Sequence, residues 1–211
     1  MIVLKYSTEQ EEFWAGSFGN DYVERNLDQQ LLSTKTGNFA KFLRKTSGIS
    51  NCLEVGCNIG LNLIALSRLI PNLHLQGIEI NEKAANEARK IKNTEVFCGS
   101  VFDYPIEESK FDLAFTMGVL IHINPDKLNY VYDLLYKSSK KYIMVAEYYN
   151  PTPTEVTYRG NKGKLFKRDF AGEFMDKFGG AVKLLDYGFV YHRDQIFPLD
   201  DVSWFMMEKL K

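Results

Sequence analysis

The stretch "LEVGCNIG", residues 53–60, combines an acid with two glycines at a point where an apolar strand gives way to a helix. Gly56 and Gly60 allow a tight turn and a close approach of the backbone to a ligand. Asn58, between them, tolerates the left-handed conformation better than most residues do. Because Glu54 places a carboxylate just before this turn, we expect a ligand that needs both close backbone approach and a negative charge.

A nicotinamide dinucleotide does not meet these requirements. Its G-x-G-x-x-G fingerprint differs from the spacing of Gly56 and Gly60, and Glu54 would repel its pyrophosphate. S-adenosylmethionine carries an ammonium and a sulfonium group, and opposite charges about 4 Å apart attract by several kcal/mol at an effective dielectric of about 20. We therefore expect S-adenosylmethionine as cofactor, bound by Glu54, Gly56, Asn58 and Gly60. The alternative is a plain glycine-rich turn.

The ends of the following predicted strands offer more cofactor-binding candidates. These candidates are Glu79, Ile80, Ser100, Val101, Met117 and Gly118. A carboxylate at Glu79 can accept hydrogen bonds from both ribose hydroxyls. Ser100 and the backbone of Val101 can read the adenine edge, while Met117 and Gly118 would lie beneath the methionine part. Taken singly, each residue could instead be a solvated strand end or part of the core.

The acceptor side of the site is predicted from one histidine and one long loop. His122 follows the fourth strand, where the methyl group should point, and its unperturbed pKa of about 6.5 suits a general base. A histidine that only packs or caps is the alternative. The loop 150–164 and its flanks provide Tyr148, Tyr149, Tyr158, Arg159, Lys162, Lys164, Lys167 and Arg168. Tyr149 would offer a rigid ring with a hydroxyl tip, and Arg159 a fork for a carboxylate or phosphate. The lysines could equally be solvated.

The first part of the chain reads as helix. Residues 6–46 are mostly polar with interspersed aromatics, and a break is expected near "GSFGND". Tyr22 and Arg25 are three residues apart and would share one helical face. We expect Arg25 to clamp the carboxylate of the methionine moiety while this segment covers the cofactor as a lid.

From residue 51 onward, predicted strands and helices alternate. The predicted strands are 51–56, 73–80, 94–99, 111–118, 141–149, 181–192 and 202–210. Pro125 near the start of the helix at 125–139, and Asn81 as the N-cap of another helix, support this division. Such alternation implies right-handed βαβ units and a mostly parallel sheet, whose sites lie at the carboxyl ends of the strands.

With these motifs in this order, residues 50–209 resemble the class I S-adenosylmethionine-dependent methyltransferases. "LEVGCNIG" is similar to their E/D-x-G-x-G-x-G first motif, with Asn58 at the middle glycine. The resemblance implies an α/β, Rossmann-like fold, with a seven-stranded, mostly parallel sheet, helices on both faces and an antiparallel C-terminal hairpin. We expect an N-terminal helical lid over residues 1–48, followed by a single methyltransferase domain over 49–211.

A narrower resemblance covers nearly the whole chain. The stretches "FWAGSFGNDYVERN", "EVGCNIGLN", "GVLIHINPD", "EYYNPTPTEVTYRG" and "KLFKRDFAGEFMDKFG" resemble the pseudaminic acid biosynthesis-associated methylases. This resemblance implies a role around a nine-carbon acidic sugar of bacterial surface glycosylation, with the sugar or its nucleotide conjugate as acceptor. It does not indicate which atom receives the methyl group.

Composition limits the remaining possibilities. The chain has 211 residues and a net charge of −1, from 26 basic and 27 acidic residues, which argues against general binding to nucleic acid or to an anionic membrane. The sequence predicts no signal peptide, no membrane span and no metal site, and we expect a cytoplasmic protein with reduced cysteines. A methyltransferase for tRNA or protein, and a non-catalytic module that keeps the cofactor fold, are the alternatives. The oligomeric state is left open.

Overall fold

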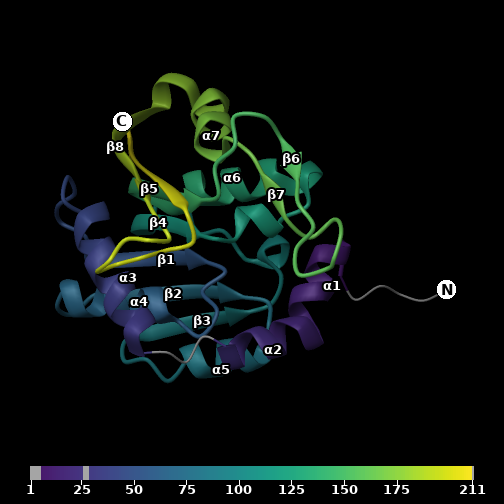
Figure 1. Ribbon diagram of the computed structural model, residues 1–211. Coiled ribbons are helices and arrows are strands. Elements are labelled where there is room, and N and C mark those ends of the chain that lie inside the picture. Colours follow the sequence, from purple (N-terminus) through teal and green to yellow (C-terminus); the bar gives the residue numbers. More distant parts are fainter. Residues whose placement is uncertain (1–5, 26–28, 211) are drawn as a thin grey trace.

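The computed structural model describes residues 6–25 and 29–210 and contains a seven-stranded sheet with the order β3-β2-β1-β4-β5-β9-β8 (Figure 1). Its strands are β1 (Asn51–Val55), β2 (His74–Glu79), β3 (Thr94–Cys98), β4 (Phe111–Met117), β5 (Ser139–Glu147), β8 (Val182–Val190) and β9 (Val202–Lys209). β1 to β5 pair in parallel, while β9 pairs antiparallel with both β5 and β8. The predicted Rossmann-like fold and its antiparallel C-terminal hairpin are therefore confirmed.

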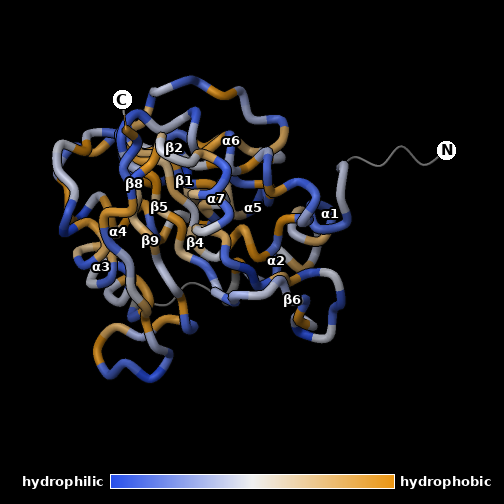
Figure 2. The backbone as a smooth tube through the Cα atoms, turned by 90° about the horizontal axis from the view of Figure 1, so that it is seen from above, coloured by the Kyte–Doolittle hydropathy of each residue, from blue (hydrophilic) through white to orange (hydrophobic). Residues whose placement is uncertain are grey.

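Helices cover both faces of this sheet. The α-helices are α1 (Glu9–Ala15), α2 (Ser17–Arg25), α3 (Gln29–Phe42), α4 (Leu61–Leu69), α5 (Glu82–Ala88), α6 (Leu128–Ser138) and α7 (Phe170–Phe178). Buried side chains of α3, α4 and α5 share one core cluster with the sheet, and those of α6 and α7 share a second one. Figure 2 shows hydrophobic residues concentrated in the interior of the chain, with hydrophilic residues mostly in the outer turns. The two-sided cover explains why central strands read as apolar runs, since a parallel sheet is buried on both faces.

The segment before residue 48 divides into two structural parts. Phe39 and Phe42 of α3 are fully buried in the core, where Phe42 lies 4.8 Å from the ring of Trp204. α3 therefore belongs to the layer that covers the sheet. α1 and α2 instead lie at the end of the sheet where the parallel strands terminate (Figure 1). The helical break falls at Gly16, between α1 and α2, so most of "GSFGND" is helical.

The long loop predicted after β5 contains a short hairpin. β6 (Thr154–Glu155) pairs antiparallel with β7 (Phe166–Lys167). The hairpin loop lies against α1, because Gln10 donates a hydrogen bond to the carbonyl oxygen of Gly163 at 2.8 Å. Residues 153 positions apart in the sequence thus meet near the carboxyl edge of the sheet.

Candidate functional site

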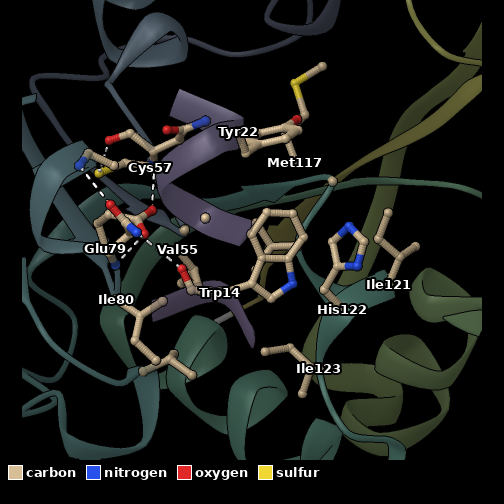
Figure 3. A pocket seen from close by; sticks show the side chains of 18 of the residues that line it. Trp14, Tyr22, Val55, Cys57, Glu79, Ile80, Met117, Ile121, His122 and Ile123 are labelled. Carbon is tan, nitrogen blue, oxygen red and sulfur yellow. Dashed lines mark hydrogen bonds between the residues drawn. The ribbon is translucent and has the colours of Figure 1, made fainter. Parts of the chain in front are cut away.

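A cavity of about 520 Å³ lies at the carboxyl edge of the parallel strands, a size typical of small-molecule sites. Loops after β1, β2, β3 and β4 form its floor, and α1 and α2 contribute to its cover (Figure 3). The predicted site residues that line it are Tyr22, Gly56, Asn58, Glu79, Ile80, Ser100, Val101, Met117, Gly118, His122 and Arg159. The structure thus brings together residues predicted separately from six segments of the chain. Arg25 ends α2, but its side chain lies outside the described residues.

The turn between β1 and α4 has the backbone conformation that its sequence predicts. Gly56, Asn58 and Gly60 have φ angles of 71°, 48° and 82°, in the left-handed region. A Cβ atom on Gly56 would lie 2.5 Å from the side chain of Val119, so this position requires glycine. Gly60 does not line the cavity; it precedes α4 as the N-cap, and a Cβ there would meet Ile91 at 2.3 Å. Its role is to shape the turn.

Glu54 lies beneath this turn and does not line the cavity itself. It is fully buried, and its Oε1 atom accepts a hydrogen bond from Asn62 at 2.5 Å. Asn62 in turn accepts one from the ammonium group of Lys35 at 2.7 Å. Burial raises the pKa of Glu54 to about 8, against the opposing effects of Asn62 and Lys35. Glu54 does not itself reach the cavity, whereas Asn62, its hydrogen-bond donor, and Lys35 both line it.

Glu79 closes β2 and joins two loops of the cavity. Its Oε2 atom accepts a hydrogen bond from the backbone N–H of Asn58 at 2.7 Å, and its Oε1 atom accepts one from that of Asn81 at 2.8 Å. Burial raises the pKa of this carboxyl group, and the two N–H donors act against the rise. Each carboxylate oxygen keeps a further lone pair, so Glu79 can still accept hydrogen bonds from the ribose hydroxyls of a nucleoside.

In the loop after β3, the side chain of Ser100 contacts another residue of the protein, whereas the prediction assigned it to the adenine. The hydroxyl of Ser100 donates a hydrogen bond to the Oε1 atom of Glu11 in α1, at 2.6 Å. Ser100 therefore offers its proton to a carboxylate, and Glu11 itself lines the cavity. Glu11 could not be predicted as a site residue from the sequence, because an acid in a polar helix normally faces solvent.

His122 stands on the turn after β4 and faces the cavity. Its Nδ1 atom lies 2.6 Å from the carbonyl oxygen of Lys164. Because a carbonyl only accepts hydrogen bonds, Nδ1 carries the proton and Nε2 keeps the lone pair. Burial lowers the pKa of His122 to about 4, so the ring is neutral at pH 7. The indole of Trp14 faces this ring, with the two centroids 4.6 Å apart (Figure 3).

A buried carboxylate fixes the turn that carries His122. Glu147, at the end of β5, accepts hydrogen bonds from the backbone N–H groups of Val119 and Leu120, each at 3.0 Å. It also accepts one from the hydroxyl of Thr116 at 3.3 Å. The sequence does not predict this contribution of Glu147, because a buried acid at the end of a strand looks the same in sequence as an exposed one.

Of the tyrosines predicted for the acceptor side, Tyr148 and Tyr158 line the cavity and Tyr149 does not. Successive side chains of an extended segment point to opposite sides, and it is Tyr148 that lines the cavity. Tyr149 is 44% exposed and its ring lies 6.5 Å from that of Phe205. Tyr148 donates a weak hydrogen bond to Asp200 at 3.4 Å.

Two residues of the predicted basic cluster form ion pairs within the protein. Lys164 pairs with Glu9 at 3.1 Å, and Arg168 pairs with Glu173 at 2.7 Å. Arg159 is exposed at the cavity rim, with its guanidinium 5.9 Å from the ring centroid of Tyr158. Within the described ranges, it forms no ion pair, so its charge remains available to a ligand.

Unsatisfied polar atoms gather at this cavity. Buried polar atoms are normally hydrogen-bonded, yet Trp14 Nε1, Glu54 Oε2 and Asn58 Oδ1 have no partner among the residues that the structure describes. All three belong to the cavity wall or to the side chain directly beneath it. Trp14 and Asn58 line the cavity, so one donor and one acceptor there fit a polar ligand that carries both kinds of group, as S-adenosylmethionine does.

No arrangement of three or more His, Cys, Asp or Glu side chains in residues 6–25 and 29–210 could hold a metal ion. The same ranges contain no helix with the length and hydropathy needed to cross a bilayer.

The strand order, the glycine turn and the acidic end of β2 together define the class I methyltransferase fold. Residues 52–141 match the family described as "Methyltransferase domain". Over these residues the chain is therefore similar to methyltransferase domains, and its fold is that of methyltransferases that use S-adenosylmethionine as cofactor.

Known proteins agree with this assignment. An uncharacterized methyltransferase of Schizosaccharomyces pombe is 26% identical over 95 residues, which are 39% of this chain and 33% of the relative. An uncharacterized protein of Rickettsia prowazekii is 35% identical over 77 residues, which are 34% of this chain and 14% of the relative. This chain therefore matches only a third or less of the length of these curated relatives.

Solved structures show the same fold over nearly the whole chain. The plantazolicin methyltransferase BpumL in complex with SAH has a TM-score of 0.66 at 13% identity, covering 96% of this chain and 94% of that one. Magnesium protoporphyrin IX methyltransferase from Synechocystis, also with bound SAH, has a TM-score of 0.64 at 14% identity, covering 95% and 97%.

Proposed function

We propose that this protein is a cytoplasmic enzyme that transfers a methyl group from S-adenosylmethionine to a hydroxyl group of a small anionic acceptor, with His122 as the general base. The observation that carries the proposal is the state of His122. Its Nδ1 position is bound to Lys164, its pKa is low, and it lines the same cavity as the cofactor-binding loops. A neutral imidazole with a lone pair on Nε2 can take a proton from a hydroxyl.

The residues of the cavity divide between the cofactor and the acceptor. Asn58 and Glu79 would hold the nucleoside, and Met117 and Gly118 would lie under the methionine part. The methionine carboxylate needs a cation. Arg25 remains the sequence-based candidate for this role, and Lys35 is a second candidate, because it belongs to the cavity wall.

The proposed reaction is a direct displacement. S-adenosylmethionine supplies an already activated methyl group on its sulfonium. The protein has to hold the acceptor oxygen about 3 Å behind that methyl group and exclude water. As the C–O bond forms and the C–S bond breaks, the hydroxyl proton passes to Nε2 of His122. Trp14 and Tyr158 flank the imidazole, with centroid distances of 4.6 Å and 5.0 Å, and restrict access of water to it.

The acceptor is proposed to be an acidic sugar of the pseudaminic acid type, or its nucleotide conjugate. Arg159 at the rim has no ion-pair partner in the part of the chain that the structure describes, and this supports an anionic group, since its planar fork binds carboxylates and phosphates in two-point contact. The rings of Tyr148 and Tyr158 offer flat apolar surfaces beside it, on which a sugar ring can stack. The resemblance of the chain to pseudaminic acid biosynthesis-associated methylases points to the same class of acceptor.

Incubation with isotope-labelled S-adenosylmethionine and a panel of nonulosonic acids and their nucleotide conjugates tests the proposal. Mass spectrometry should detect the gain of one labelled methyl group on an acidic sugar, and this product should be lost with His122→Ala. Transfer to RNA or protein without transfer to any sugar would contradict the proposed acceptor. Failure to bind S-adenosylhomocysteine would contradict the enzyme class itself.

A further inference from the structure

We propose that Glu11, carried into the cavity by α1, reads the exocyclic amino group of the cofactor's adenine. This inference rests on the proposed function. It assigns a specificity role to a residue of the N-terminal segment, on a helix outside the sheet and its covering layers.

The position of Glu11 marks the adenine end of the cavity. Its side chain is 8% exposed, lines the cavity, and accepts the hydrogen bond from Ser100 across 89 positions of sequence. Ser100 and Val101 follow β3, next to the strand β2 that ends in the ribose candidate Glu79. A nucleoside whose ribose contacts Glu79 would therefore direct its base toward Val101 and Glu11.

The chemistry of Glu11 selects one edge of the base. Burial raises the pKa of Glu11, but hydrogen bonds from Ser100, Ser7 and Thr8 outweigh it and lower the pKa below its usual value. The side chain is therefore an acceptor only. Adenine presents an amino donor at C6 beside a ring-nitrogen acceptor, so a carboxylate fits the amino group and the backbone N–H of Val101 fits the nitrogen.

Glu11 has room for this additional bond. A carboxylate can accept about four hydrogen bonds. The Oε2 atom accepts from Ser7 at 2.6 Å and from Thr8 at 2.9 Å, whereas Oε1 accepts only from Ser100 among the described residues. One lone pair of Oε1 thus remains for a ligand at the cavity wall.

A role in capping α1 does not account for this geometry. Thr8 is the N-cap of α1 and Glu11 stands three residues later, which is the capping-box spacing. The local contacts with Ser7 and Thr8 use Oε2, and capping does not require the bond from Oε1 to Ser100. Glutamine also serves in a capping box, so Glu11→Gln keeps the cap while it removes the charge.

The same helix connects the adenine end to the acceptor end. Trp14 follows Glu11 by three residues and shares its helical face, and its indole faces His122. A bond between Glu11 and the adenine would fix α1, and with it the wall of the acceptor pocket. Cofactor binding should therefore precede acceptor binding.

Isothermal titration of the full chain with S-adenosylhomocysteine and S-inosylhomocysteine tests the inference. In the inosine analogue a carbonyl oxygen replaces the amino group and would face the carboxylate. A hydrogen bond to a charged group contributes about 1.5–3 kcal/mol, so wild type should prefer the adenine ligand by about 10-fold to 150-fold. The ring nitrogen that faces Val101 carries a proton in the inosine analogue, so part of the preference should persist in every variant. Glu11→Gln should nevertheless reduce the preference several-fold, because its amide can donate to the carbonyl.

Glu12→Gln is the matched control, since Glu12 is exposed on the same helix, and it should keep the wild-type preference. If Glu11→Gln binds S-adenosylhomocysteine and also keeps that preference, the inference is overturned while the proposed function stands. If wild type binds neither ligand, both fall together.

Discussion

The Nδ1 atom of His122 lies 2.6 Å from the carbonyl oxygen of Lys164, a residue of the hairpin loop forty-two positions later in the chain. This contact links the turn after β4 to the segment that carries the acceptor candidates. It also selects the tautomer of the ring, since only a protonated Nδ1 can donate to a carbonyl. The hairpin loop thus contributes to the chemistry through its backbone as well as through Tyr158 and Arg159.

We expect His122→Gln to lower kcat by about 10²-fold to 10⁴-fold, the usual contribution of a general base. The dissociation constant for S-adenosylhomocysteine should change little, because His122 lies on the acceptor side. Labelled-methyl transfer and calorimetry measure the two quantities. His192→Gln is the control, as that exposed ring pairs with Asp201. An unchanged kcat in His122→Gln would rule out the base.

The low pKa of His122 predicts a specific dependence of stability on pH. Its unfolded value is about 6.5 and its folded value about 4. Between these values the unfolded chain binds the proton and the folded chain does not, so acid favours unfolding. Relative to His122→Gln, wild type should lose up to about 3 kcal/mol as the pH falls from 7 to 4. Urea unfolding of both proteins across this range checks the difference, and parallel curves would contradict it.

Gly56→Ala should weaken both the fold and cofactor binding. The position has a φ of 71°, and a Cβ would lie 2.5 Å from Val119. The left-handed conformation alone costs about 1–2 kcal/mol for a residue with a side chain, and the displaced Val119 adds to this. Gly180→Ala is the matched control, since nothing lies within 4 Å of its Cβ position. Equal melting temperatures for the two variants would refute the prediction.

Arg159→Ala should raise KM for an anionic acceptor by about 10-fold or more, because a charged hydrogen bond contributes about 1.5–3 kcal/mol. Affinity for S-adenosylhomocysteine should stay at the wild-type value. Lys162→Ala, which removes an exposed charge three residues away, should have a smaller effect. Steady-state kinetics with the acidic acceptor and with its neutral amide derivative show whether Arg159 contacts the negative charge. Equal losses for both acceptors would exclude a charge-specific contact.

Asn62→Leu should destabilise the fold by about 1–3 kcal/mol, the cost of an unsatisfied buried polar group. The substitution removes the donor to Glu54 and the acceptor for Lys35. Urea unfolding at pH 7 measures the loss. Asn86→Leu serves as control, because Asn86 is exposed on α5. A variant as stable as wild type would show that Glu54 does not depend on this amide.

The order and type of the strands could be read from the sequence, because each central strand is an apolar run bounded by turn residues. β4, for instance, was expected over 111–118 and spans Phe111–Met117. The positions of the cofactor-binding loops could be predicted from the same pattern, since the carboxyl ends of parallel strands lie at one edge of the sheet. The alternation of side chains could not show which tyrosine after β5 faces the cavity, because the extended segment leaves the sheet there. The sequence therefore did not distinguish Tyr148, which faces the cavity, from Tyr149, which does not.

Residues that reach the site from outside the βα units could not be predicted in this way. Glu11 and Lys35 lie in polar helical segments, where charged side chains usually face solvent. Their contacts with Ser100 and Asn62 span 89 and 27 positions, and no local spacing rule describes them. Thr8 and Glu11 do form a capping-box pattern in the sequence, which could have located the start of α1 but not its partner across the cavity.

Glu79 already bonds the loops after β1 and β2 to each other through Asn58 and Asn81. The ribose side of the crevice is thus rigid before any ligand arrives, so binding there should cost little ordering entropy. Changes to the ribose hydroxyls of the ligand should consequently be tolerated poorly.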